Sequence, residues 1–290
     1  MGASGSTPGE RWAAEALTEL RKAGFHPRAW IAFLSASARR AAETRGQRPE
    51  LARQAARWSA AWAVASLAAR AVPGAPRAPA SAEAAWWAAN AAMLRWHLGM
   101  VEGPAGERRT RLSAADAFTL GRLWLVPRVG AASGRPKAFT GLVVVAAASD
   151  AADGRLAARA GPTRLGRDLD TAADLCLHGT ATVAAARSKW LPRGLAAALV
   201  ARQVAEVGWV TAHYLARGEP PPPGPRALSL ATSPVLSGGL VAAATGRRRT
   251  AAVSLGGASA VKVAVRLAGV HGPRGVRDAA AHAERPRDGV

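Results

Sequence analysis

The sequence predicts an all-α protein, a bundle of apolar helices with a helical extension on its N-terminal side. Ala-rich apolar runs recur along the chain, bounded by charged residues or by Pro-rich stretches such as "VPGAPRAPAS" and "GEPPPPGPR". Residues 1–50 instead place Trp, Leu and Phe at roughly helical spacing among charged residues, as in "ERWAAEALTELRKAG". Together these two patterns favour helices throughout.

The composition favours an anionic partner but does not decide whether the protein is soluble or lies in a membrane. The 290-residue chain has a formal net charge of +20 and a pI near 11.8, which favours nucleic acid, phospholipid headgroups or a phosphorylated substrate. Its ten Trp residues suit a membrane boundary, whereas a mean hydropathy of +0.01 is low for a polytopic protein. The single Cys176 excludes an internal disulfide and any multi-cysteine metal site. Composition alone therefore leaves a soluble and a membrane protein both open.

Residues 1–111 are expected to form the N-terminal helical extension. The stretch "RAWIAFLSASARRAAETR" is basic and amphipathic, which suits either a bilayer surface or a soluble bundle. Two apolar runs, starting at Trp58 and Ala84, flank "VPGAPRAPAS". We therefore expect a hairpin at about residues 58–101, which is a candidate membrane hairpin, before the charged linker "EGPAGERRTR" ends the region.

Six apolar segments follow residue 112 and are expected to form the main domain, residues 112–270. A membrane-spanning helix needs about 20 mainly apolar residues. Only Ala227–Gly246 meets this requirement without a charge, because the other runs are shorter and are interrupted or bounded by charge. The polar, Gly- and Pro-punctuated residues 271–290 are expected to be a disordered basic tail.

An acidic window, "SDAADGRLAARAGPTRLGRDLDTAADL", separates the second and third of these segments. Asp150 and Asp153 are three residues apart and Asp170 and Asp174 four apart, so each pair shares one face of its helix. Asp168 lies off that face and is expected to be solvated. Two facing carboxylate pairs repel each other unless a cation lies between them, and oxygen ligands favour Mg²⁺ or Mn²⁺. Surface acids paired with neighbouring Arg side chains are the alternative interpretation.

The spacing in this window resembles the signature of CDP-alcohol phosphatidyltransferases, D-x2-D-G-x2-A-R-x8-G-x3-D-x3-D. The matching residues are Asp150, Asp153, Gly154, Ala157, Gly166, Asp170 and Asp174. Upstream, "FTLGRLWLVP" is similar to the start of the family's first membrane helix, and Arg202 lies where members often carry an arginine in the fourth helix. The interval from Asp153 to Gly166 is one residue shorter than the signature. The motif arginine is therefore either replaced by Ala158 or displaced to Arg159, which we favour.

The resemblance implies a polytopic membrane bundle with a six-helix catalytic core, in the cell membrane, with its active site facing the cytoplasm. It implies transfer of a substituted phosphate from a CDP-linked donor to an alcohol, with release of CMP, in phospholipid biosynthesis. Asp150, Asp153 and Asp170 are the expected ligands of two Mg²⁺ or Mn²⁺ ions. Asp174 is the expected general base for the acceptor hydroxyl and a further ligand.

The same resemblance implies a substrate site. Its expected residues are Gly154, Ala157 and Gly166 against the nucleotide, Thr163 as a hydrogen-bond partner, and Arg159 and Arg202 on a phosphate. The expected partners are CDP-diacylglycerol or a related donor, an alcohol or phosphorylated alcohol, membrane lipid and a second copy in a homodimer, without nucleic acid. An inactive membrane relative that only binds, and a soluble nucleic-acid-binding protein, are the competing hypotheses.

Overall fold

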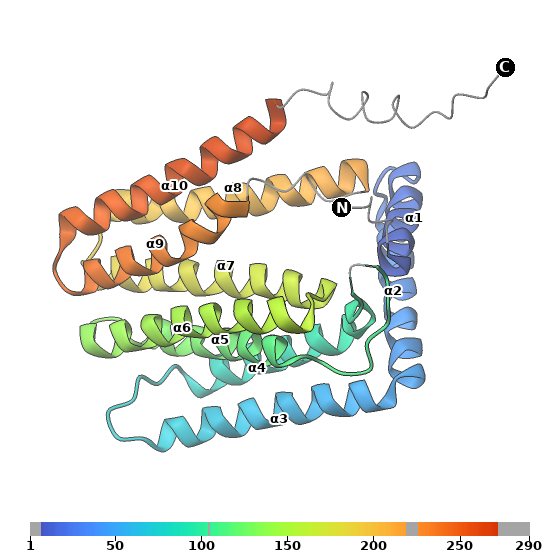
Figure 1. Ribbon diagram of the computed structural model, residues 1–290, viewed down its shortest axis with the longest axis horizontal. Coiled ribbons are helices and arrows are strands. Elements are labelled where there is room, and N and C mark those ends of the chain that lie inside the picture. Colours follow the sequence, from blue (N-terminus) through green and yellow to red (C-terminus); the bar gives the residue numbers. More distant parts are fainter. Residues whose placement is uncertain (1–6, 104, 219–225, 272–290) are drawn as a thin grey trace.

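A computed structural model describes residues 7–103, 105–218 and 226–271 (Figure 1). Every regular element among these residues is a helix, which confirms the all-α prediction. In chain order the α-helices are α1 (Pro8–Lys22), α2 (Pro27–Gln47), α3 (Pro49–Ala71), α4 (Ala80–Trp96), α5 (Ala114–Ala131), α6 (Pro136–Ala160), α7 (Arg164–Arg187), α8 (Arg193–Arg217), α9 (Arg226–Ala244) and α10 (Arg248–His271). A short 3-10 helix, η1 (Leu98–Met100), follows α4.

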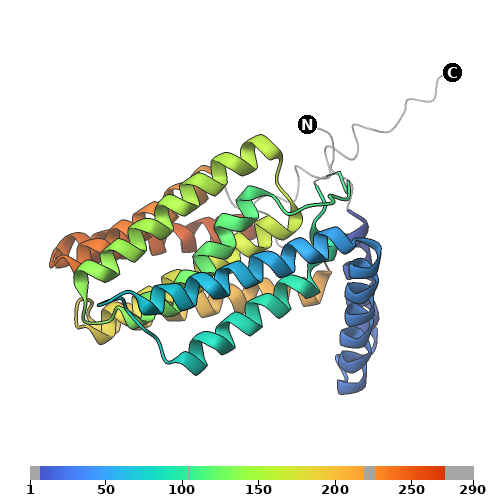
Figure 2. The same ribbon diagram turned by 90° about the horizontal axis from the view of Figure 1, so that it is seen from below.

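The helices form a long bundle with a crosswise pair at one end. Helices α3 to α10 follow the long direction of the molecule, while α1 and α2 lie across the bundle end (Figures 1 and 2). The connection between α6 and α7 lies at this α1–α2 end, and the α3–α4 turn lies at the opposite end. Helix α5 packs against α6 and α7, and α9 packs against α10 and α6. Helices α5 to α10 thus form the six-helix unit expected after residue 112.

Several helices begin where the sequence supplies a local start signal. Pro8, Pro27, Pro49 and Pro136 lie in the first turn of their helices, where the missing N–H of proline costs no hydrogen bond. Helix α5 begins with a capping box, in which Ser113 and Asp116 exchange side-chain to backbone hydrogen bonds.

The N-terminal extension contains the expected hairpin, formed by α3 and α4 on either side of the "VPGAPRAPAS" turn. The hairpin packs against α5 and shares a hydrophobic core with the main domain. The buried residues of this core are Leu51, Ala55, Leu94, Leu98, Val101, Leu112, Leu120, Leu123, Leu165, Leu169 and Ala173. The extension is therefore packed onto the first and third helices of the six-helix unit.

One described helix has the length and hydropathy of a membrane span. Among the described residues, only α8 is long and apolar enough to cross a bilayer, and the stretch Thr232–Ala244 of α9 is apolar but shorter. Large apolar side chains are nevertheless exposed on several helices, including Val144 and Val145 of α6, Val204 of α8 and Val253 of α10. The "GEPPPPGPR" break and the expected basic tail lie almost wholly outside the described residues.

Candidate active site

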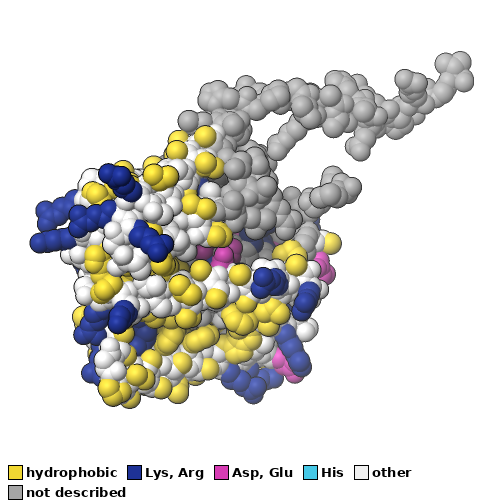
Figure 3. Space-filling view, turned by 60° about the vertical axis from the view of Figure 1, so that its left-hand side comes forward, with side chains coloured by type: hydrophobic (Ala, Val, Ile, Leu, Met, Phe, Trp, Pro, Cys, Tyr) yellow, Lys and Arg dark blue, Asp and Glu magenta, His cyan; other side chains and the backbone are white. Residues whose placement is uncertain are grey.

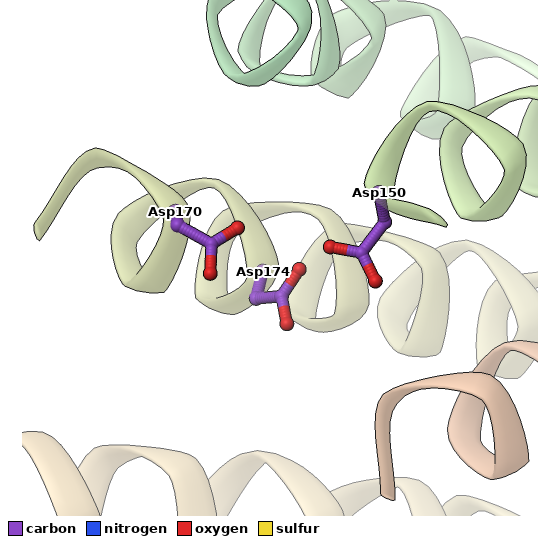
Figure 4. Close-up of side chains that lie close together, drawn as sticks. All are labelled: Asp150, Asp170 and Asp174. Carbon is purple, nitrogen blue, oxygen red and sulfur yellow. The ribbon is translucent and has the colours of Figure 1, made fainter. Parts of the chain in front are cut away.

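Two neighbouring helices bring the four signature aspartates together. Asp150 and Asp153 come from α6, and Asp170 and Asp174 from α7. Carboxylate oxygens of Asp150, Asp170 and Asp174 lie within 4.8 Å of one another, and Figure 4 shows these three side chains converging between the helices. The face-sharing predicted from the three- and four-residue spacings is thus seen in the structure. On the face drawn in Figure 3, a small group of acidic side chains is visible among hydrophobic ones.

A buried guanidinium from α5 lies at the centre of the cluster. The Arg122 side chain is 0% exposed, and its Nη1 donates to Asp150 Oδ1 at 2.7 Å and to Asp174 Oδ1 at 2.8 Å. Its Nη2 donates to Asp153 Oδ2 at 2.6 Å and also to Asp170 Oδ1. One arginine therefore bridges both carboxylate pairs with charge-assisted hydrogen bonds.

Two hydroxyl groups, one from α5 and one from α9, each donate a hydrogen bond to one of the carboxylates. Thr119 Oγ1 of α5 donates to Asp153 Oδ2 at 3.0 Å, and Asp153 is the most buried of the four aspartates. Ser233 Oγ of α9 donates to Asp174 Oδ2 at 2.7 Å. Both oxygens of Asp174 therefore have a partner, because Oδ1 already accepts from Arg122. Asp174 is the carboxylate whose orientation is fixed from two directions.

The charge of the cluster suits divalent cations. Four ionised carboxylates around one guanidinium leave three negative charges without compensation on these five side chains. Hard cations such as Mg²⁺ and Mn²⁺ prefer oxygen ligands of this type. Asp150, Asp170 and Asp174 offer such ligands close together and are partly accessible, with 28–49% of each side chain exposed. The donor set therefore fits the divalent ions that the sequence predicts.

The predicted substrate residues of α6 lie on its last turns. Gly154 is exposed, and a Cβ atom there would meet open space, so nothing in the described protein requires a glycine at this position. Ala157 is half-buried, and Arg159 is exposed near the end of the helix. Gly154 and Arg159 are therefore accessible, and their contact with a nucleotide stays a prediction.

The predicted substrate residues at the start of α7 have structural roles. Thr163 is the buried N-cap of α7, and its Oγ1 accepts from the N–H of Gly166 at 2.9 Å. A Cβ atom at Gly166 would lie 2.8 Å from Asp116 Oδ1, so close packing already accounts for this glycine. Neither observation tests a contact with the nucleotide, which stays a prediction.

Arg202 and Asp168, which the sequence analysis also singled out, each form an ion pair with a neighbouring residue of the same helix. Arg202 of α8 pairs with Glu206 one turn later, at 2.7 Å between Nη1 and Oε2. Its Nε is buried without a hydrogen-bond partner, which leaves a donor for a ligand or water. Asp168 is exposed and pairs weakly with its neighbour Arg167 at 3.5 Å, in agreement with its predicted position off the shared face.

Sequence reasoning missed Arg122, Thr119 and Ser233. The first two lie within "FTLGRLWLVP", whose likeness to a family helix was evident although no role was assigned to its residues. The available signal was that Arg122 is the one charged residue of this apolar stretch and lies three residues after Thr119. Ser233 lies in an apolar run with other hydroxyl residues, and nothing local distinguishes it.

The fold and the site define an α-helical protein with a carboxylate cluster suited to divalent cations. Residues 112–255 match the family model described as CDP-alcohol phosphatidyltransferase, so this part of the chain is a domain of that family. The match begins two residues before α5 and includes the four aspartates and Arg122. No curated protein and no solved structure matches the chain.

Proposed function

We propose that this protein is a membrane enzyme that transfers a phosphatidyl-type group from a CDP-linked donor to an alcohol, releasing CMP, in phospholipid biosynthesis. The observation that carries the proposal is the convergence of the four signature aspartates on one site, in a domain of this family. The donor class is that of the family, and CDP-diacylglycerol is the specific donor we propose.

Asp150, Asp153, Asp170 and Asp174 would hold Mg²⁺ or Mn²⁺ on their carboxylate oxygens. Such ions neutralise phosphate charge and polarise the reacting phosphate when they are bound. Arg122 keeps the carboxylates at hydrogen-bonding distance of one centre despite their mutual repulsion. The protein thus supplies both the ligands and a permanent counter-charge.

Asp174 would take the proton of the acceptor hydroxyl. The hydroxyl oxygen forms a bond to the donor phosphorus that carries the lipid group, and the bond from that phosphorus to the CMP oxygen breaks. The proton passes to Asp174, and CMP leaves with the electron pair of the broken bond. The hydrogen bond from Ser233 keeps the Asp174 carboxylate oriented for this task.

Substrate binding would use the remaining predicted residues. The open space beside Gly154 suits close approach of a nucleotide to α6, next to Ala157 and Arg159. Thr163 and Gly166 would contact the nucleotide from the start of α7. Arg202, with its unpartnered Nε, would donate to a phosphate of donor or acceptor.

Membrane insertion with the carboxylate site near the cytoplasmic face is part of the proposal. Exposed valines on α6, α8 and α10 suit lipid contact, and an ionisable cluster inside a bundle marks a functional site. The segment that precedes α5 lies at the α1–α2 end (Figure 1) and contains Arg108, Arg109 and Arg111, which suit a cytoplasmic location. Resistance of the protein to carbonate extraction is the expected result, and its release without detergent would refute insertion.

The test of the activity is incubation of the purified protein with CDP-diacylglycerol, Mg²⁺ and a panel of alcohols and phosphorylated alcohols. CMP should appear only with the true acceptor, and a chelator should abolish its release until Mg²⁺ or Mn²⁺ is restored. Binding of the donor without CMP release under any condition would support an inactive relative instead.

A further inference from the structure

The N-terminal extension contacts the connection between α6 and α7, residues 161–163. The contact is made by a strap, which we define as residues 101–103 and 105–109, between η1 and α5. The backbone carbonyl of Glu102 accepts from the N–H of Arg164 at 3.0 Å. Arg109 Nη1 donates to the carbonyl of Gly161 at 3.0 Å, so the strap holds both ends of the connection.

The Glu102 side chain joins three segments that are distant in the sequence. Its carboxylate is 3% exposed, accepts from Thr7 Oγ1 at 2.6 Å and pairs with Arg164 Nη1 at 3.4 Å. A Cβ atom at Gly9 would lie 2.7 Å from Arg164 Nη1, so the first turn of α1 packs directly on this pair. A buried carboxylate is stable only with such partners, and the three segments are therefore held together.

Arg48, the residue between α2 and α3, fastens the strap from the other side. Its guanidinium donates to the carbonyls of Leu98, Val101 and Arg109 at 3.1–3.3 Å. These three acceptors lie before, at the start of and at the end of the strap. Arg48 thus links the strap by hydrogen bonds to the α2–α3 part of the extension.

The strap also completes the start of α7. The first N–H groups of a helix have no partner inside the helix. In α7, Glu102 O accepts from the N–H of Arg164, and Thr163 Oγ1 accepts from the N–H of Gly166. Asp170 follows on the same helix less than two turns after Arg164. The strap therefore sets the position of the α7 turns that carry the third aspartate.

We propose that the N-terminal extension acts as a clamp that positions the start of α7 for the CDP-linked donor, with Glu102 as its central positioning residue. The proposal rests on the proposed function for the identity of the donor. It assigns a role to residues 1–111, all of which lie outside the family match. Loosening the clamp should weaken donor binding while the aspartates keep their chemistry.

Glu83 offers a matched control. Its side chain is 6% exposed, accepts from the Ser66 hydroxyl and pairs with Arg70 at 2.7 Å and Arg128 at 3.0 Å. It belongs to the first turn of α4, next to the α3–α4 turn at the opposite end of the bundle (Figure 1). Glu83→Ala therefore removes an equally buried ion pair far from the clamp.

The experiment compares Glu102→Ala, Glu102→Gln and Glu83→Ala in the full chain. Amide hydrogen exchange of residues 161–170 should accelerate in Glu102→Ala and remain unchanged in Glu83→Ala. The KM for CDP-diacylglycerol should rise about tenfold in Glu102→Ala with kcat retained, since a charge-assisted contact of this kind is lost. Glu102→Gln, which keeps an acceptor for Thr7, should fall between the wild type and Glu102→Ala in both measurements.

Unchanged exchange at 161–170 in Glu102→Ala would overturn the clamp, whatever the activity. Faster exchange with an unchanged KM would overturn its role in donor binding, as would an equal rise of KM in Glu83→Ala. If the wild type releases no CMP with any alcohol, the proposed function fails and the donor role with it, while hydrogen exchange still decides the clamp. If Glu102→Ala does not fold, the hydrogen exchange and the KM of Glu102→Gln are compared with those of Glu83→Ala instead.

Discussion

Replacing Arg122 with Met should destabilise the protein in a way that divalent cations repair. Met keeps a similar length and removes the guanidinium that donates to all four aspartates. Removing one partner of a buried ion pair costs about 3–5 kcal/mol, because the opposite charge is left without compensation. At about 2–4 °C per kcal/mol, the variant should melt about 6–20 °C below the wild type in the presence of a chelator.

Mg²⁺ should then raise the melting temperature of Arg122→Met by more than that of the wild type. The cluster has three uncompensated negative charges in the wild type and four in the variant, so the cation gains more by binding there. The assay is thermal unfolding in detergent, followed by tryptophan fluorescence, with chelator and with saturating Mg²⁺. An ion that binds the folded state at about 1,000 times its Kd adds about 4 kcal/mol, which is of the size required.

The control is Arg128→Met, since Arg128 is another buried arginine of α5 and pairs with Glu83 rather than with the aspartates. It should lose stability to a similar degree, and Mg²⁺ should raise its melting temperature only as much as in the wild type. Equal Mg²⁺ responses in Arg122→Met and Arg128→Met would refute the idea that Arg122 is the internal counter-charge of a cation site.

Three further predictions concern single side chains of the site. Asp170→Asn should abolish CMP release whereas Asp168→Asn should largely keep it, and equal losses would contradict the helical-face assignment. Asp174→Asn should bind the CDP-linked donor in calorimetry while turnover falls about 10²–10⁴-fold, as for a lost general base. Asp153→Asn should instead weaken metal and donor binding together, and indistinguishable donor binding in the two variants would leave no separate role for Asp174. Ser233→Ala should lower kcat by about 10–100-fold through loss of a hydrogen bond to a carboxylate. Wild-type kcat in Ser233→Ala would show that Asp174 needs no such support.

The parts of the site that could be predicted from sequence are those that local helix geometry determines. Asp150 and Asp153 share a face because residues three apart on a helix do so whatever surrounds them, and the same holds for Asp170 and Asp174. The off-face position of Asp168 follows from the same rule. The helices themselves were recognisable because proline and charged residues mark their ends. The two acidic faces, on α6 and α7, were expected to face each other because only a short connection separates the two helices.

The partners of these carboxylates could not be predicted in this way. Arg122 reaches Asp150 across 28 residues of sequence and Asp174 across 52, and Ser233 reaches Asp174 across 59. Such contacts depend on how α5 and α9 pack against α7, which periodicity within one helix does not encode. Hydropathy was also uninformative, because Ala and Gly fill the helix contacts and lower the apolar character of each segment. Among the described helices, α8 alone accordingly has the length and hydropathy of a membrane span.

The acidic side chains of this bundle fall into two groups, according to whether neighbouring arginines balance their negative charge. Glu83 and Glu102 each have arginine and a hydroxyl group as partners, so each forms a closed unit without a need for further ions. The aspartate cluster has a single arginine for its carboxylates, and its oxygens are partly accessible. Such an imbalance of charge is costly, and the divalent cations that we propose at this site would relieve it. The same comparison separates the structural ion pairs of the extension from the site at which we propose that phosphate chemistry occurs.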